Sequence, residues 1–162
     1  MFSNKSAITI LSSLMLVTSA LCLPAQARTK TCSEDLILKY GQSCKYKSVT
    51  FTVNKPNRFN PGGSGIWSGK YKYTFLINVA NGSSRIVKFD SITVRASSSA
   101  GDGDKAFDSA HNINGEPDSS LLPHRTVKFL EGFGFRSSRD LTVQVNVDPF
   151  SSYAGPTVYW TR

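Results

Sequence analysis

The chain has 162 residues, of which 40% are hydrophobic, and its 19 Lys and Arg outnumber its 11 Asp and Glu to give a net charge of +8. This length allows one domain that buries roughly two thirds of its unfolded surface. With only two His and three Cys, and no CxxC, His-x-His or HExxH motif, the sequence lacks the usual redox and metal centres. We therefore expect no metal, no cofactor and no enzymatic activity.

Residues 1–27 have the order typical of a secretory signal peptide. One cation, Lys5, precedes a mostly apolar run over residues 7–23, and Ala25-Gln26-Ala27 supplies a small-x-small cleavage motif. We predict cleavage after Ala27, a secreted or periplasmic location, and a single mature domain over residues 28–162. A membrane anchor at this segment and a lipid on Cys22 are the alternatives.

The mature chain keeps two cysteines, Cys32 and Cys44, because Cys22 leaves with the signal peptide. An even pair in an oxidising compartment predicts a disulfide. We expect this bond to tie the N-terminal strand to its neighbour.

The positive charge is concentrated in the first part of the mature chain. Residues 28–75 contain nine Lys and Arg but two acids, whereas residues 76–162 contain nine of each, and no acid occurs between Asp35 and Asp90. Such a layout indicates either a solubilising surface or a face that binds anions.

Strand patterns begin soon after the cysteines. Residues 36–40 are a short apolar run, and residues 46–53 alternate apolar and polar side chains, so each predicts a strand. Residues 54–65 then contain two Pro, three Gly and three Asn, which predicts a long loop. This loop carries Lys55, Arg58 and Phe59 and leads to Trp67. We interpret them as candidate ligand-binding residues, although a Trp at the head of a strand, such as Trp67, is more often a packing residue.

The stretch 70–95 is the strongest β pattern. Tyr71 and Tyr73 share one parity with Phe75, while Lys70 and Lys72 share the other, so the lysines are predicted to meet solvent and to extend the candidate site. Because the tyrosines then face the core, base stacking is disfavoured and nucleic acid is an unlikely partner.

A turn signal at Asn81-Gly82 interrupts this stretch. It predicts either a tight hairpin, which would set Phe75 opposite Phe89 and Ile77 opposite Val87, or a crossing between two packed sheets. The buried parity changes near Asp90-Ser91, where we expect a bulge.

Residues 96–120 are rich in Ser, Gly and Asp and hold five acids against Lys105. The repeat Gly101-Asp102-Gly103-Asp104 is similar to the start of a calcium loop, but Ala106 and Ile113 occupy later ligand positions. A solvated acidic turn, with one irregular strand near residues 106–113, is the preferred interpretation.

Three further strands complete the chain, at residues 126–135, 141–147 and 157–161. Seven or eight strands without a sustained helical period predict an all-β fold, an antiparallel immunoglobulin-like β-sandwich.

The order of these segments resembles bacterial immunoglobulin-like domains of the CARDB and related envelope type. Those domains often read V-x-N-x-G, a strand, L-x-P-G-x-x-x-x-F, and a strand ending in Val-Asp. Here Val79-Ala80-Asn81-Gly82, the run from Leu122 to Phe129 and Val147-Asp148 correspond, with His124 in place of the glycine. The resemblance covers residues 71–148 and implies a fold and a binding or spacer role, without a catalytic site.

These observations lead to one main functional hypothesis. We expect an exported, non-catalytic binding or adhesion module whose basic half contacts an anionic polysaccharide, a lipid headgroup or an acidic protein surface. The alternatives are a structural subunit that self-associates through its basic and acidic parts, and a membrane-acting secreted toxin.

Overall fold

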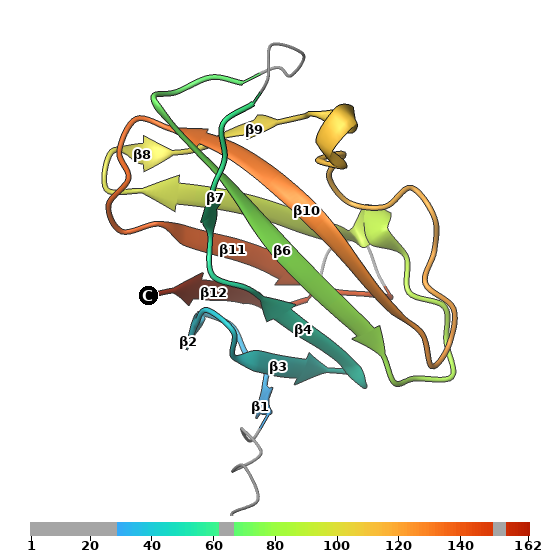
Figure 1. Ribbon diagram of the computed structural model, residues 1–162. Coiled ribbons are helices and arrows are strands. Elements are labelled where there is room, and N and C mark those ends of the chain that lie inside the picture. The colour runs from blue at the N-terminus through green and yellow to red at the C-terminus, as the bar shows by residue number, and fades with distance from the viewer. Residues whose placement is uncertain (1–28, 62–66, 151–154) are drawn as a thin grey trace, which may run out of the picture.

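The computed structural model describes residues 29–61, 67–150 and 155–162, so the predicted signal peptide and its cleavage site lie outside the described residues. Two β-sheets pack face to face, with their strands crossing at an angle (Figure 1). The described strands are β1 (Lys30–Thr31), β2 (Leu36–Lys39), β3 (Ser43–Tyr46), β4 (Val49–Val53), β5 (Asn57–Arg58), β6 (Tyr71–Asn81), β7 (Ile92–Ser98), β8 (Gly101–Asp102), β9 (Asp104–Ala106), β10 (Thr126–Phe135), β11 (Thr142–Val147) and β12 (Thr157–Thr161).

The predicted β-sandwich is confirmed. Eight of the described strands have four or more residues, and the other four have two or three. Two short 3₁₀ turns, η1 (Phe89–Ser91) and η2 (Ser109–His111), are the helical elements in the described residues. Most strand pairs are antiparallel, but β1 pairs with β3 and β2 pairs with β12 in parallel. The N-terminal segment therefore contributes one strand to each sheet.

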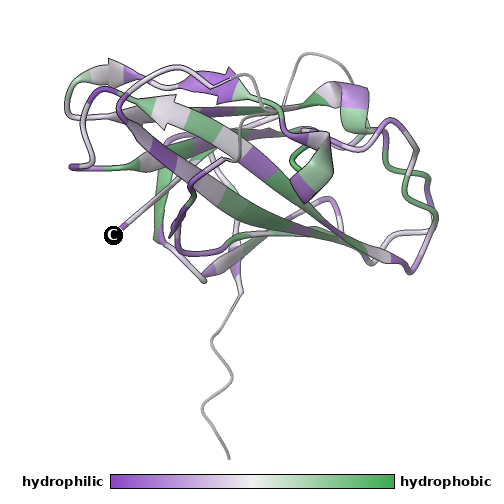
Figure 2. Cartoon of the chain, turned by 45° about the horizontal axis from the view of Figure 1, so that its top comes forward, coloured by the Kyte–Doolittle hydropathy of each residue, from purple (hydrophilic) through white to green (hydrophobic). Residues whose placement is uncertain are grey.

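The large sheet has seven strands in the order β1-β3-β4-β6-β10-β9, with β5 also paired to β6, and the small sheet has the order β2-β12-β11-β7-β8. The core lies between the two sheets because alternate residues of each strand point inward. Phe75 and Ile77 of β6, Phe133 of β10 and Val145 of β11 are fully buried there. The alternation of hydrophobic and hydrophilic residues is visible along the strands in Figure 2.

The predicted disulfide is present. Cys32 follows β1 directly and bonds to Cys44 in β3, with a Cα–Cα distance of 5.0 Å. Both residues are buried. The bond joins the N-terminal strand to its neighbour, as the sequence predicted.

The hairpin alternative at Asn81-Gly82 is wrong, and the chain crosses between the sheets instead. β6 is paired on both sides, by β4 and β10, so Phe75 lies opposite Glu131 rather than Phe89. Asn81 is buried, and its side-chain amide donates to the carbonyls of Arg85, Leu121 and Leu122, while its Oδ1 accepts from Ser83 N–H. One asparagine thus stabilises the crossing segment, a role that the tight-turn interpretation did not include.

Two further details differ from the sequence predictions. The expected strand over residues 46–53 is split by Lys47 and Ser48, which both have positive φ and close a two-residue hairpin between β3 and β4. The change of buried parity near Asp90-Ser91 is produced by η1 rather than by a bulge. A 3₁₀ turn re-phases the side chains because its period is three rather than two.

Candidate anion-binding site

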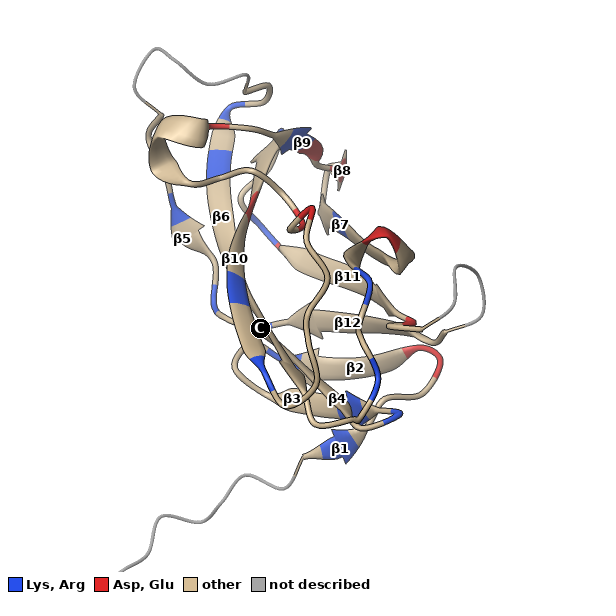
Figure 3. Cartoon of the chain, turned by 90° about the vertical axis from the view of Figure 1, so that its right-hand side faces the viewer, with Lys and Arg blue, Asp and Glu red and all other residues tan. Residues whose placement is uncertain are grey.

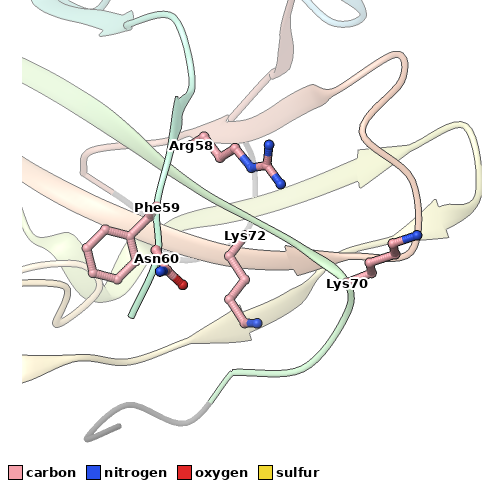
Figure 4. Close-up of a pocket in the computed structure, with 5 residues that line it drawn as sticks. All are labelled: Arg58, Phe59, Asn60, Lys70 and Lys72. Atoms are coloured by element: carbon pink, nitrogen blue, oxygen red, sulfur yellow. The ribbon is translucent and has the colours of Figure 1, made fainter. Parts of the chain in front are cut away.

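A pocket of about 440 Å³ opens on the outer face of the large sheet, lined by Arg58, Phe59, Asn60, Lys70 and Lys72 (Figure 4). We call these five residues the basic pocket. Four of them are sequence-predicted site residues, and the structure brings them together although 14 positions separate Arg58 from Lys72. Asn60 is the lining residue that the sequence did not indicate, because an asparagine in a Pro- and Gly-rich loop looks like an ordinary turn residue.

Strand pairing builds the pocket. The short strand β5 lies antiparallel to β6 with Arg58 opposite Tyr73, and Phe59 N–H donates to the Lys72 carbonyl at 3.0 Å. The predicted long loop therefore contains a strand that lies against β6. Backbone pairing therefore brings the segment that carries Arg58, Phe59 and Asn60 alongside Lys70 and Lys72.

The alternation along β6 directs its lysines into the pocket. Tyr71 and Tyr73 pack against the core, so Lys70 and Lys72 point to the opposite, solvent side, as predicted. In Figure 3 basic residues mark β5 and β6, whereas the acidic residues are distributed over other parts of the molecule, including β8.

A cluster of aromatic rings supports the loop side of the pocket. The Phe59 ring lies 5.2 Å from the Trp67 ring and 5.1 Å from the His111 ring, measured between centroids. Trp67 in turn lies over β10, where a Cβ added at Gly132 would be 2.9 Å from its ring. Trp67 is thus a packing residue beneath Phe59 rather than a lining residue, which was the alternative interpretation of it.

The glycines of β10 make room for this arrangement. Gly132 and Gly134 occupy the outward positions of the strand, and a Cβ at Gly134 would overlap the Ser68 carbonyl oxygen. Segment 67–69 can therefore cross β10 in direct contact with its backbone. The glycines at alternate positions of this strand are the sequence signal that indicates such close approach.

The three cations of the basic pocket have no acidic partner within the described part of the chain. The ion pairs found there involve Lys47, Lys105 and His111 instead. Lys70 Nζ lies 5.4 Å from the Tyr71 ring centroid, which leaves its donors available. Lys55, the remaining candidate cation, is exposed in the loop but does not line the pocket.

The acidic residue of β10, Glu131, points away from the basic pocket. Glu131 lies on the inner face of the strand, is fully buried, and has its Oε2 atom 3.2 Å from Lys105 Nζ. Lys105 also donates to Glu116 from the loop before β10. Burial raises the pKa of Glu131 to about 8; repulsion from Glu116 adds to this rise, and Lys105 opposes it. Lys105 thus pairs with Glu116 and Glu131, and neither of these acids pairs with a cation of the basic pocket.

The composition of the basic pocket defines what it can bind. Arg and Lys are donors only and attract phosphate, sulfate or carboxylate groups, and Asn60 can add an amide donor. Phe59 offers an apolar surface beside them. Together these groups suit the recognition of an anion.

The chain is similar to known proteins in its fold, through solved structures. No protein-family model and no curated protein matches the chain. Within the described residues, no helix is long and apolar enough to cross a membrane.

Among solved structures, the yjhA protein of Bacillus subtilis has a TM-score of 0.55 at 16% identity, covering 75% of this chain and 98% of its own. A candidate lipoprotein, ycdA, of Bacillus subtilis subsp. subtilis has a TM-score of 0.52 at 11% identity, covering 83% of this chain and 39% of its own. An uncharacterised β-sandwich protein of Clostridium difficile 630 has a TM-score of 0.48 at 12% identity, covering 83% and 98%. At these identities the likeness to yjhA and ycdA concerns the fold: this chain is a β-sandwich.

Proposed function

We propose that the protein is a non-catalytic binding module that recognises an anionic polymer through the basic pocket. The observation that carries the proposal is the placement of Arg58, Lys70 and Lys72 around one open hollow, without a carboxylate partner in the described residues. Cations without a protein partner attract anionic groups, and several weak contacts along a polymer add up.

We infer that the protein works outside the cytoplasm, in a secreted or periplasmic location. A signal-peptide pattern in the sequence and the Cys32–Cys44 disulfide both favour an oxidising, extracytoplasmic compartment. The fold likeness to a protein described as a candidate lipoprotein agrees with this. Mass spectrometry of the exported protein should find a chain that starts at Arg28, and an intact N-terminus or a modified Cys22 would contradict the inference.

The finer assignment to immunoglobulin-like sandwiches of the CARDB type is also a proposal. Its support is at His124, which has a φ of 58° at the position where the family pattern has glycine. A left-handed conformation is what glycine usually provides.

The decisive experiment is retention of the protein on immobilised heparin, a sulfated polysaccharide, over a range of salt concentrations. Wild-type protein should bind at low salt and elute as salt displaces it, because each cation–anion contact releases a counterion. The triple variant Arg58→Glu, Lys70→Glu, Lys72→Glu should lose retention.

A matched control variant tests whether heparin retention depends on the basic pocket or on the net charge of the protein. Lys39→Glu, Lys88→Glu, Arg125→Glu removes the same number of exposed cations outside the basic pocket. We expect this control to elute at nearly the wild-type salt concentration. Equal loss in both triple variants would show that overall charge is responsible, and failure of the wild type to bind at low salt would reject the proposed function.

A second candidate function is self-association of a structural subunit. It is favoured by an acidic hollow of about 350 Å³ beside η1, whose lining includes Asp90, Glu116 and Asp118 and which could receive the basic pocket of another copy. Light scattering should then detect assemblies at about 0.1 M salt that dissociate at about 1 M, where the Debye length falls from about 10 Å to about 3 Å. A monomer at every salt concentration would exclude it.

A further inference from the structure

The outer face of the small sheet carries a second pocket, of about 340 Å³, whose chemistry differs from that of the basic pocket. Its floor is formed by outward side chains of three adjacent strands. Thr93 of β7, Asn146 of β11 and Thr157 of β12 make one cross-strand row. Arg95 and Gln144 begin the next row. Asp90 and Ser91 of η1 also line the pocket.

All seven lining residues are polar, and their donor and acceptor roles are mixed. Asp90 accepts hydrogen bonds, Arg95 donates them, and the amide and hydroxyl groups of Gln144, Thr93 and Thr157 do both. The formal charges of Asp90 and Arg95 cancel, and within the described residues neither side chain belongs to an ion pair. The pocket therefore does not select an anion or a cation.

The row that begins with Arg95 and Gln144 continues to the aromatic ring of Tyr159. Tyr159 of β12 lies opposite Gln144 and is half-buried, on the same outward parity. Strands about 4.8 Å apart bring the amide of Gln144 and the ring of Tyr159 close together. A polar row that ends in an aromatic side chain offers hydrogen bonds and an apolar surface to the same ligand.

Part of this surface is held in place by the fold. Asn146 Nδ2 donates to the Gly155 carbonyl at 3.1 Å, and its Oδ1 accepts from Asp148 N–H at 3.4 Å. Ser91 Oγ donates to the Lys88 carbonyl at 2.8 Å, which fixes η1 at the wall of the pocket. Part of the floor and one wall are thus pre-formed, which reduces the entropy lost on binding.

We propose that this pocket binds an uncharged oligosaccharide. Sugar hydroxyls donate and accept hydrogen bonds, as the mixed lining requires, and the C–H face of a pyranose can lie on Tyr159. The absence of a net charge disfavours the anionic polymers that suit the basic pocket. Because the two pockets lie on the outer faces of opposite sheets, each can be occupied without the other, and this inference does not depend on the proposed function.

The test is titration of the ¹⁵N-labelled protein with cellohexaose, chitohexaose and maltohexaose, three uncharged glycans, followed by NMR. At least one should shift the backbone amides of Thr93, Arg95, Gln144 and Thr157, with a dissociation constant on the order of 1 mM that is unchanged between low and high salt. Absence of shifts with all three glycans, shifts confined to other residues, or affinity that falls steeply with salt would overturn the proposal.

Two variants make the test specific. Arg95→Ala and Gln144→Ala each remove hydrogen-bonding groups from the pocket at the surface and should weaken binding by about fivefold or more. Lys128→Ala changes an exposed residue of β10, in the other sheet, and should bind like the wild type. Wild-type affinity in both pocket variants would also reject the site.

Discussion

Two residues of this protein are in energetically unfavourable states: Glu131 has a buried carboxyl group, and His124 has a left-handed backbone conformation. Glu131 is fully buried and meets Lys105 as an ion pair without hydrogen-bond geometry. Burial alone would lower the pKa of Lys105, but its hydrogen bond with Glu116 and the charge of Glu131 together raise it. The buried carboxylate is thus expensive to ionise, whereas its lysine partner stays charged.

Glu131 makes the stability of the protein depend on pH. Its pKa rises from 4.5 in the unfolded chain to about 8 in the folded protein, so folding takes up a proton between these values. The contribution of Glu131 to the free energy of unfolding should be largest below pH 4.5 and should fall as pH rises toward 8, by at most about 1.4 kcal/mol per pH unit.

Glu131→Gln should remove this dependence, because the amide does not ionise. Urea unfolding at pH 5 and pH 9 measures it, with the exposed Asp118→Asn as control. An equal pH dependence in wild type and Glu131→Gln would show that Glu131 ionises normally.

His124 holds a left-handed backbone conformation, with φ of 58°, that costs a non-glycine residue about 1 kcal/mol. His124→Gly should relieve this strain, although the unfolded chain gains flexibility, and we expect a net stabilisation of about 0.5 kcal/mol. Thermal unfolding would detect it. His124→Ala, which keeps the strain, should not stabilise, and a lower melting temperature for the glycine variant would contradict the argument.

Among the secondary-structure elements, β10 has two faces with different structural roles. Its inward residues Phe129, Phe133 and Phe135 fill the core. Its outward glycines at positions 132 and 134 accept the segment that carries Trp67 and, through it, Phe59. One strand therefore supports both the sandwich and the basic pocket.

Gly134→Ala should displace segment 67–69, because the new methyl group would overlap the Ser68 backbone. Overpacking of this kind costs about 1–3 kcal/mol, and loss of the aromatic support should also weaken heparin retention. Thr126→Ala, at an outward and exposed position of the same strand, is the control and should retain both properties. Full heparin retention in Gly134→Ala would show that the pocket does not depend on this contact.

At the scale of the whole molecule, the N-terminal segment joins the sandwich together. β1 pairs in the large sheet and β2 in the small one, and both pairings are parallel, at sheet edges. The disulfide connects this segment to β3. A bond across a short segment of 12 residues thus secures the only described strands that are paired in parallel to their neighbours.

Cys32→Ala, Cys44→Ala should lower the free energy of unfolding by about 2–3 kcal/mol, from the lost restriction of the unfolded chain. Urea unfolding measures this, and reduction of the wild type should produce a similar loss. Unchanged stability on reduction would mean that strand pairing alone holds β1 in place.

The sequence by itself predicted the β-sandwich, the disulfide and the outward direction of Lys70 and Lys72. Each of these follows from local information: alternation sets which face a side chain occupies, and the two cysteines after residue 27 have only each other as partner within that part of the chain. The strands over residues 126–135 and 157–161 were predicted with the bounds that the structure shows.

Tertiary structure alone decided how these parts are arranged. An Asn-Gly pair fits a hairpin and a sheet crossing equally well, and only the pairing of β6 by β4 and β10 excludes the hairpin. The basic pocket depends on β5 pairing with β6, and the polar pocket on residues from η1, β7, β11 and β12 meeting on one face. Such contacts join residues far apart in the chain, and their energies depend on long-range packing that no local pattern encodes.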